Sequence, residues 1–356
     1  MSVNKLERRV HTMRVTLKSI AAVSGVSIGT VDRVLHNRSG VSEETKAQVQ
    51  KAAEELGYKS NIIGKALVAQ RNPLKVGVII NAKEFNYFAE EVWRGVEAGS
   101  EEIESFGVSV IYYPMDTVDE GAQLLLLDKA KRDGVNGLVI KPVNSPAVQA
   151  AIDGLVDNKV SVITCTSDIV NSKRLCFVGH DHRHEGRMLG SLLSKVVPPE
   201  ARIAVITGSM HVLGHRRKTE GFNSAVTEHR PDVKILGVFE TNHNTALAVS
   251  IVDALEREGG VDALCVQSMD KKGLESICGH FEKEKKPLVC SFGTGAELSG
   301  LVMDGLVDFA IEENPYQQGY RAMKLMFDVL FNGYVPPSPF CEVEAHIVID
   351  ESYVHH

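Results

Sequence analysis

Side chains that could hydrogen-bond a polyhydroxylated small molecule follow the apolar runs in the larger, C-terminal part of the chain. Tyr87 and Phe88 come after the first run and could stack on the apolar face of a sugar ring. The polar candidates follow later runs, and they are Thr166, Asp168, Asp181, Arg216, Gln267, Asp270, Thr294 and Glu313. Each hydroxyl group of a polyol offers one donor and two acceptor positions, which carboxylate, guanidinium and amide groups can match. Each of these residues has an equally good alternative role as a loop or helix-capping group.

The apolar runs that carry these side chains have the composition of buried parallel strands. They are rich in Val and Ile, and Gly, Asn or Asp bounds them, as in a parallel sheet covered on both faces. The runs cover residues 75–80, 108–113, 137–140, 160–164, 202–206, 233–236, 263–266 and 287–290. Ligands of open α/β sheets bind beyond the carboxyl ends of the strands, where the candidate side chains lie.

The spacing of the runs predicts two similar lobes. Lys75 precedes Arg202 by 127 residues and Val108 precedes Val233 by 125, so the second four runs repeat the first four. We expect a first lobe of about residues 75–180 and 308–335, and a second lobe of about residues 185–305 and 336–350. The strand ends of two facing lobes would form a cleft that can close by a hinge motion.

The chain lacks the short motifs that mark common enzyme and cofactor sites. It contains no H-E-x-x-H, Walker A or G-x-S-x-G pattern, and residues 292–295 do not form a dinucleotide fingerprint. We therefore expect no catalytic residue and no cofactor. The six cysteines are scattered without a C-x-x-C pair, which predicts buried, reduced thiols.

Charge is distributed unevenly along the chain. Residues 1–75 hold thirteen Lys or Arg against six Asp or Glu, whereas the remainder holds 26 against 40. A small basic head on a large acidic body indicates that the head alone contacts nucleic acid. No run approaches the ~20 consecutive apolar residues of a membrane helix, and no apolar signal-peptide core follows the charged start. We therefore expect a cytoplasmic protein that does not bind membranes.

The basic head reads as three short helices between residues 15 and 58. Thr16 and Ser27 are candidate N-caps of the first two helices, Gly25 suits the turn between them, and Ser42 begins the third. Two helices joined by a short turn with glycine form the helix-turn-helix pattern, whose second helix enters the major groove of DNA. The exposed residues of that helix would be Ser27, Ile28, Gly29, Thr30 and Arg33, and the apolar stripe of the third helix would be Ala47, Val49, Ala52, Ala53 and Leu56. A plain three-helix subdomain is the alternative.

The segment from Val15 to Leu35 resembles the DNA-binding domain of the lactose-repressor (LacI/GalR) family. Gly25-Val26-Ser27-Ile28-Gly29-Thr30-Val31-Asp32-Arg33-Val34 follows that family's motif, with Asp32 where serine is common. Asp32 could accept a hydrogen bond from a cytosine amino group or orient Arg33. The resemblance continues through residues 41–45 and 56–58, and it implies DNA contacts by Thr16, Asn37 and Ser42 as well as by the second helix.

Residues 61–69 align with the hinge helix of the same family. That helix folds on operator DNA in a dimer, so the resemblance implies DNA contacts by Lys65 and a minor-groove wedge at Leu67. An ordinary linker leucine is the alternative for Leu67. The expected domains are a disordered extension at 1–14, the helix-turn-helix domain at 15–60, the hinge and linker at 61–74, and an effector-binding and dimerisation domain at 75–350.

The body resembles the type I periplasmic-binding-protein fold of the ribose-binding kind. The segments that carry this resemblance are Asn86-Tyr87-Phe88, Lys141-Pro142-Val143, Phe177 to Asp181, Arg216 to Phe222 and Glu313 to Tyr320. It implies effector contacts by Asn86 and Lys141 in addition to the side chains at the strand ends. His180 and His184 could share a helical face and hold a metal, but this stretch matches the family's turn into a helix, so we expect no metal. Thr294 and Glu313 depart from the ribose pattern, which indicates an effector other than ribose.

Together these patterns predict an all-α helix-turn-helix head on an α/β body with two lobes and parallel sheets. The resemblance implies a transcriptional regulator that senses a small sugar or polyol. In such families the regulator is usually a repressor that the sugar releases from DNA. It also implies a homodimer on a roughly palindromic operator. A solute-binding protein without a regulatory role is the first alternative, and an enzyme that acts on a sugar is the second.

Overall fold

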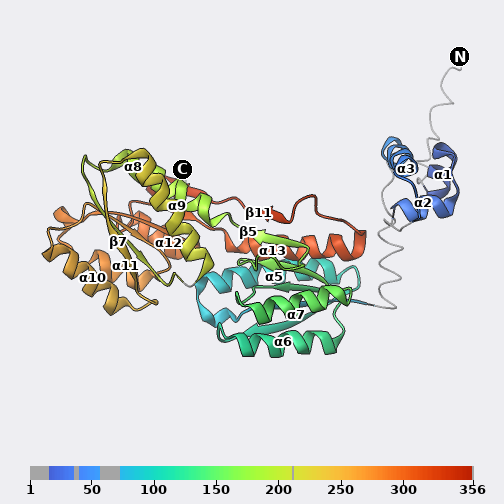
Figure 1. The fold of residues 1–356 in the computed structure, drawn as a ribbon, viewed down its shortest axis with the longest axis horizontal. Coiled ribbons are helices and arrows are strands. Elements are labelled where there is room, and N and C mark those ends of the chain that lie inside the picture. Colours follow the sequence, from blue (N-terminus) through green and yellow to red (C-terminus); the bar gives the residue numbers. More distant parts are fainter. Residues whose placement is uncertain (1–15, 36–39, 57–72, 211, 355–356) are drawn as a thin grey trace, which may run out of the picture.

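The computed structural model describes residues 16–35, 40–56, 73–210 and 212–354 (Figure 1). The head consists of α1 (Leu17–Ser24), α2 (Ile28–Leu35) and α3 (Glu43–Glu55), which pack around one apolar cluster. The fully buried members of that cluster are Ile20, Val31 and Val49. The predicted helices are confirmed, and the expected hinge helix at residues 61–69 lies outside the described residues.

Local signals in the sequence set the limits of the head helices. Thr16 caps α1, because its side chain accepts a hydrogen bond from the Ser19 amide. Gly25 follows α1 with φ +66°, a left-handed conformation that glycine adopts without steric cost. Ser27 accepts from the Thr30 amide over 3.0 Å at the start of α2. The predicted apolar stripe of α3 contains one residue that does not belong to it. Ala47 is exposed, whereas Val49, Ala52 and Ala53 are buried.

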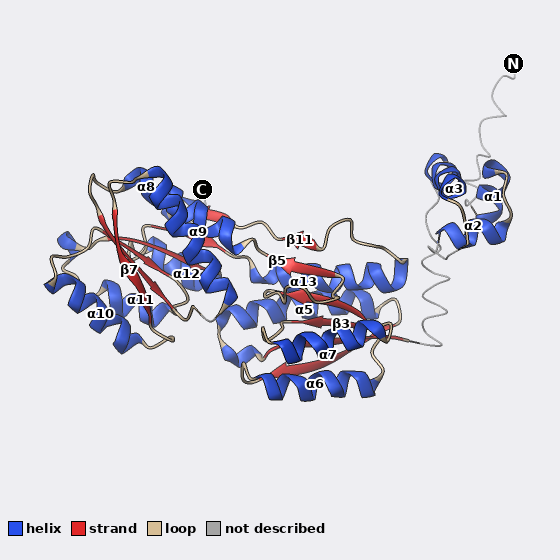
Figure 2. Ribbon diagram, in the orientation of Figure 1, coloured by secondary structure: helices blue, strands red, loops and turns tan. Residues whose placement is uncertain are grey.

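The first lobe is a six-stranded sheet with two helices on each face (Figure 2). Its strand order is β11-β5-β4-β3-β1-β2, and the pairs are parallel. The strands are β1 (Leu74–Asn81), β2 (Val108–Met115), β3 (Gly137–Ile140), β4 (Ser161–Cys165), β5 (Cys176–Gly179) and β11 (Phe340–Glu342). The helices are α5 (Tyr87–Glu104) and α13 (Pro315–Phe327) over one core, and α6 (Glu120–Asp133) and α7 (Pro146–Asp157) over the other.

The second lobe repeats this plan with strand order β12-β10-β9-β8-β6-β7. The strands are β6 (Arg202–Thr207), β7 (Lys234–Glu240), β8 (Ala263–Val266), β9 (Leu288–Gly293), β10 (Phe309–Glu312) and β12 (His346–Val348). Helices α8 (His182–Val196) and α9 (Leu213–His229) cover one core, and α10 (Thr245–Arg257), α11 (Lys271–Cys278) and α12 (Gly295–Met303) cover the other. Short helical turns lie at Lys83–Phe85, Lys283–Lys285, Asp328–Asn332 and Asp350–Ser352. Two similar lobes of parallel strands are therefore confirmed, with β12 as an antiparallel edge strand.

The predicted lobe limits are wrong in the C-terminal part of the chain. Strand β10 pairs with β9, so residues 309–312 belong to the second sheet and not to the first. Strand β11 pairs with β5, so residues 340–342 belong to the first sheet and not to the second. The chain therefore crosses between the lobes after β5, after β10 and again between β11 and β12. A strand of three residues such as β11 carries too few side chains for a periodic signal.

Glycines bring the two helices on one face of each lobe into close contact. A Cβ atom on Gly186 of α8 would lie 2.0 Å from the Lys218 carbonyl oxygen of α9, and one on Gly221 would lie 2.1 Å from the Arg183 carbonyl oxygen. The same arrangement joins α5 to α13 at Gly95 and Gly319. Glycine at these positions lets the backbones of α8 and α9 approach closely, so the inward-facing side chains of the two helices lie near one another.

All six cysteines are free thiols, and five are buried while Cys341 is half-buried. The expectation of burial is confirmed for five of the six. None of the helices in the described ranges has the length and apolarity that crossing a membrane requires.

Candidate functional site

A small hollow lies at the carboxyl ends of the strands of the first lobe. It is open to solvent, has room for about one water molecule, and is lined by Ile80, Asn81, Phe88, Ala89, Val92, Lys141 and Thr166. Asn81 ends β1, Lys141 follows β3 and Thr166 follows β4, so three neighbouring strands each supply one polar side chain. Helix α5 supplies the apolar wall. The edge of the sheet is where the sequence placed a ligand site.

The polar groups of this hollow have hydrogen-bonding capacity that the described residues leave unused. Lys141 Nζ donates to Asn81 Oδ1 over 2.7 Å. Asn81 Nδ2 and Thr166 Oγ1 are buried and make no hydrogen bond. Trp93 Nε1 donates to the Asn81 carbonyl oxygen over 2.6 Å, which holds the end of β1 in place. Burial lowers the pKa of Lys141 to about 8, because desolvation penalises the charged amine.

The strand ends of the second lobe carry a different set of buried polar groups. Gln267 follows β8 and is fully buried, and its side-chain oxygen accepts from Thr219 Oγ1 over 3.2 Å. Thr207 ends β6, and its hydroxyl is buried without a hydrogen bond. Burial and the nearby charge of Lys218 lower the pKa of His215 to about 3, so this imidazole is neutral.

A buried network of charged side chains lies where two of the lobe crossings meet α8 and α9. Lys218 Nζ on α9 lies 2.6 Å from Glu313 Oε1, which belongs to the crossing after β10. Glu185 on α8 lies 3.0 Å from His182 Nδ1 and 3.2 Å from His180 Nδ1. His180 Nε2 donates to the Glu313 carbonyl oxygen, which joins the crossing after β5 to the crossing after β10.

The pKa values in this network follow from burial and neighbouring charge. Burial raises the pKa of Glu185, but the hydrogen bond from His182 and the charge of Lys218 outweigh it and lower the pKa below its ordinary value. Burial lowers the pKa of Lys218, but Glu313 and Glu185 raise it above its ordinary value. The carboxylate of Glu185 and the ammonium group of Lys218 therefore each stabilise the charged form of the other.

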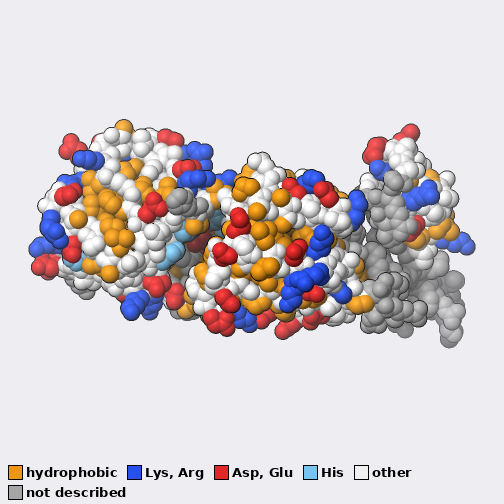
Figure 3. All heavy atoms as spheres, turned by 60° about the horizontal axis from the view of Figure 1, so that its bottom comes forward, with side chains coloured by type: hydrophobic (Ala, Val, Ile, Leu, Met, Phe, Trp, Pro, Cys, Tyr) orange, Lys and Arg blue, Asp and Glu red, His pale blue; other side chains and the backbone are white. Residues whose placement is uncertain are grey.

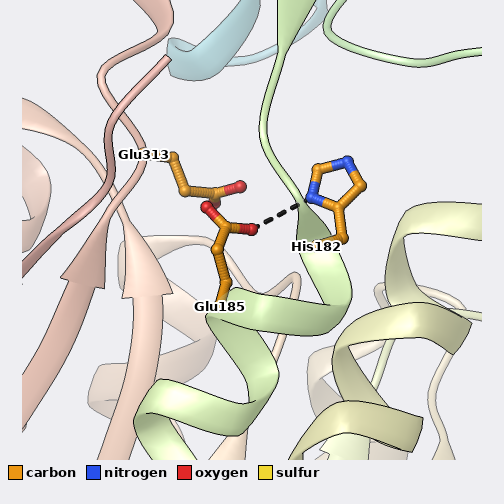
Figure 4. Close-up of side chains that lie close together, drawn as sticks. All are labelled: His182, Glu185 and Glu313. Carbon is orange, nitrogen blue, oxygen red and sulfur yellow. Dashed lines mark hydrogen bonds and ion pairs between the residues drawn. The ribbon is translucent and has the colours of Figure 1, made fainter. Parts of the chain in front are cut away.

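Three side chains of this network have the types and spacing of metal ligands. His182, Glu185 and Glu313 offer ligand atoms within 4.8 Å of one another, and Figure 4 shows them pointing toward a common point. The Lys218 ammonium group already lies beside these carboxylates and supplies the positive charge that a cation would bring. The donor set therefore fits a structural network of ion pairs better than a metal site.

Tyr87 connects the two lobes directly. It lies in the first turn of α5, and its hydroxyl oxygen accepts a hydrogen bond from the Ala296 amide at the start of α12 over 3.4 Å. Because α12 belongs to the second lobe, any opening between the lobes changes this contact.

The structure brings some of the predicted effector residues together and places others elsewhere. Phe88, Lys141 and Thr166 line the hollow. Gln267, Thr294 and Glu313 are buried at the strand ends of the second lobe. Asn86, Asp181 and Asp270 each cap their own helix, accepting from amides of the first turn. Effector contacts by all of these residues stay predictions.

Two further predicted effector residues, Asp168 and Arg216, lie beside side chains of opposite charge. Asp168 forms a two-pronged ion pair with Arg174 and accepts from Thr164 Oγ1, so it orders its own loop. Arg216 is half-exposed and lies 3.9 Å from Glu220. Lys218, two residues further along α9, points inward instead. Residues two apart on a helix do not share a face, so sequence spacing alone did not separate Arg216 from Lys218.

Asn81, Glu185, His215 and Lys218 were not predicted as site residues. A polar residue directly after the apolar run at 75–80 was the signal for Asn81. The other three lie on helices, where their burial depends on packing between helices that no short pattern reveals.

The second helix of the head presents the predicted DNA-reading side chains to solvent. Ser27, Ile28, Gly29 and Arg33 are exposed, whereas Thr30 is half-buried with its hydroxyl 2.9 Å from Ser27 Oγ. Ser42 is exposed at the start of α3, and Thr16 is exposed before α1. The predicted contacts Asn37, Lys65 and Leu67 lie outside the described residues.

Comparison with known proteins supports both parts of this architecture. The lacI family of bacterial regulatory proteins matches residues 16–61, and the periplasmic binding protein domain matches residues 76–333. Catabolite control protein A of Priestia megaterium is 25% identical over 268 residues, which cover 75% of this chain and 77% of that protein. HTH-type transcriptional regulator RegA of Clostridium saccharobutylicum is 35% identical over 123 residues, covering 35% of this chain and 36% of that protein.

The solved structures extend the likeness in fold to the whole body. GanP, a glucose-galactose binding protein from Geobacillus stearothermophilus, has a TM-score of 0.70 at 21% identity, covering 79% of this chain and 99% of that protein. A solute binding protein from Burkholderia graminis C4D1M, solved with D-arabinose, has a TM-score of 0.68 at 16% identity, covering 80% and 97%. The chain thus belongs to the periplasmic binding protein domain family through its body, and its head is a lacI-family DNA-binding domain.

Proposed function

We propose that the protein is a transcriptional repressor whose affinity for operator DNA changes when a small sugar or polyol binds its body. One observation carries this proposal. A single chain joins a helix-turn-helix head, whose second helix is exposed, to a two-lobed body with unsatisfied polar groups at its strand ends. DNA binding would place the protein in the cytoplasm.

Charge and symmetry considerations support DNA binding by the head of a homodimer. The excess of basic residues lies within residues 1–75, which suits phosphate contact. On the face of the body shown in Figure 3, acidic and basic side chains are interspersed without a continuous basic surface. One recognition helix reads only a few base pairs, so a two-fold dimer would read two half-sites of a roughly palindromic operator. The predicted minor-groove wedge Leu67 would lie between them.

The effector would act by favouring one arrangement of the lobes. A ligand shifts such an equilibrium only by the difference between its affinities for the two states. The contact between Tyr87 and Ala296 is one element that such a shift would change. No covalent chemistry is needed, which agrees with the regulatory names of the relatives.

The alternatives predict other behaviour. A solute-binding protein without a regulatory role would need only the body, and the helix-turn-helix head argues against it. An enzyme that acts on a sugar would convert its ligand, whereas a regulator would return it unchanged.

The test is selection of operator DNA from random sequence by the full-length protein, followed by affinity measurements at fixed salt. We expect an enriched palindromic sequence, and we expect Arg33→Ala to weaken binding to it by about tenfold or more, as for loss of one base contact worth ~1–3 kcal/mol. Arg94→Ala removes the same charge from an exposed position on α5 and should leave operator affinity unchanged. Failure to enrich any sequence, or equal losses in both variants, would contradict the proposal.

A further inference from the structure

Lys218, buried on helix α9, and Lys141, half-buried at the end of strand β3, have opposite electrostatic surroundings. Lys218 in the second lobe lies 2.6 Å from Glu313, and the carboxylates around it raise its pKa. Lys141 in the first lobe forms no ion pair within the described residues, and its recorded side-chain hydrogen bond goes to the neutral amide of Asn81. Its positive charge is therefore not balanced by the protein.

The groups around Lys141 cannot supply that balance themselves. Burial raises the pKa of the neighbouring Cys165 to about 12, so this thiol stays neutral. Asp168 follows the same strand as Thr166, but it is held by Arg174 in a two-pronged ion pair. The remaining wall of the hollow is apolar, with Phe88 and Val92 among its residues.

The donors around the hollow match an oxyanion. Lys141 Nζ has three hydrogens and uses one of them on Asn81 Oδ1. Asn81 Nδ2 and Thr166 Oγ1 are more than nine-tenths buried and have no partner. Asn81 directs its oxygen to the lysine, so its NH₂ group remains as an unpaired donor on a residue that lines the hollow. Unpaired buried donors cost free energy unless a ligand accepts from them.

We propose that the effector carries an anionic group, a carboxylate or a phosphate, which binds in this hollow to Lys141, Asn81 and Thr166. This inference rests on the proposed function, because it assigns a chemical class to the effector of the same site. A sugar acid and a sugar phosphate share this chemistry. The hollow is small and open to solvent, so only the charged end of such a molecule would enter it, with its hydroxyl groups extending outside.

The experiment measures binding of matched ligands to the full-length protein by calorimetry. For several pentose and hexose skeletons, the neutral sugar is compared with its aldonate or uronate and with its phosphate ester. We expect at least one acid or phosphate to bind ten times or more tightly than its neutral partner. The member that binds decides between carboxylate and phosphate.

Two substitutions test the assignment to Lys141. Lys141→Met and Lys141→Gln should weaken the anionic ligand by about tenfold to a hundredfold, as expected for a charge-assisted hydrogen bond, and should weaken neutral sugars less. Lys75→Met is the matched control, because Lys75 lies near the opposite end of the same sheet and donates to the Asp133 carbonyl oxygen over 2.9 Å. It should bind the anion like the wild type.

Operator binding without ligand separates the two proposals. If the neutral sugars bind as tightly as the acids, if no anionic compound binds, or if Lys141→Met binds the anion normally, the inference is overturned while operator binding still supports the regulator. If the anion binds as expected but no operator is found, the regulatory function fails and the anion site stands. Unchanged operator affinity of the Lys141 variants shows that they are folded.

Discussion

Lys218 Nζ and Glu313 Oε1 lie 2.6 Å apart in the interior of the second lobe, and this contact fixes helix α9 to the crossing that leads into the first lobe. The Glu313 carbonyl oxygen also accepts from His180, which belongs to the crossing after β5. Glu313 therefore links two of the segments about which the lobes would rotate. Its side chain binds helix α9, and its backbone carbonyl binds the crossing after β5.

Breaking this pair by removing one partner should be strongly destabilising. Lys218→Met leaves Glu313 buried without its cation, and we expect the free energy of unfolding to fall by about 3 to 5 kcal/mol. The measurement is urea unfolding followed by circular dichroism. The double variant Lys218→Met/Glu313→Gln removes both charges and should recover part of the loss. Equal stability of the single and double variants would contradict a coupled pair.

Glu185 should make the protein sensitive to acid. Its pKa is lower in the folded protein than in the unfolded chain, so it contributes stability above its unfolded value of about 4.3. That contribution is lost as pH falls through the folded pKa. Between about pH 5 and pH 3 the free energy of unfolding of Glu185→Gln should therefore fall less steeply than that of the wild type, by at most ~1.4 kcal/mol per pH unit.

The control for this comparison is Glu344→Gln, because Glu344 is exposed. It should follow the wild-type curve. Parallel curves for wild type and Glu185→Gln would show that Glu185 does not take part in the acid response.

Lys141 should produce a pH dependence of the opposite kind. Its folded pKa is about 8, below the ~10.4 of an unfolded lysine, so the unfolded chain binds more protons between these values. Stability without ligand should therefore rise with pH across that window. Lys141→Met should lack the rise and be more stable than the wild type at pH 7 by about 1 to 2 kcal/mol, since the side chain is only partly closed off from solvent. Lys75→Met should retain the rise, and its absence from the wild type itself would refute the account.

The close contact of α8 with α9 should not tolerate a methyl group. Gly186→Ala places a Cβ atom 2.0 Å from the Lys218 carbonyl oxygen, so the helices must separate, and we expect a loss of about 2 kcal/mol or more. Gly154→Ala is the matched control, because a Cβ atom there meets nothing within 4 Å and alanine favours the helix. A thermal melt that ranks the two variants equally would argue against this packing.

The sequence predicted the parts of the fold that depend on local pattern. The Val and Ile runs located eight of the strands, because buried parallel strands need apolar side chains on both faces. Thr16, Gly25 and Ser27 were predicted at the helix ends, because capping depends on single side chains close to the helix that they cap. The placement of β10 and β11 could not be predicted, since pairing between distant short strands leaves no local pattern.

The position of the candidate site was predicted, but the hydrogen-bond partners of its side chains were not. Thr166 was identified from the strand ends and Lys141 from the family resemblance. Nothing in the sequence indicated that Asp168 pairs with Arg174 or that Asn81 accepts from Lys141. Those choices depend on which side chains tertiary packing brings within hydrogen-bond range. The same reason explains why Arg216 was named and Lys218 was not.

The three lobe crossings have a consequence for synthesis of the protein on the ribosome. The first lobe needs α13 and β11, and the second needs β10 and β12. Neither lobe can therefore complete its fold until residues beyond 308 have been synthesised. The head needs only residues up to α3 and can fold as soon as they emerge from the exit tunnel. A nascent chain would therefore hold a finished DNA-reading head on a body still open at two sheet edges, and truncation near residue 308 would leave both lobes without an edge strand.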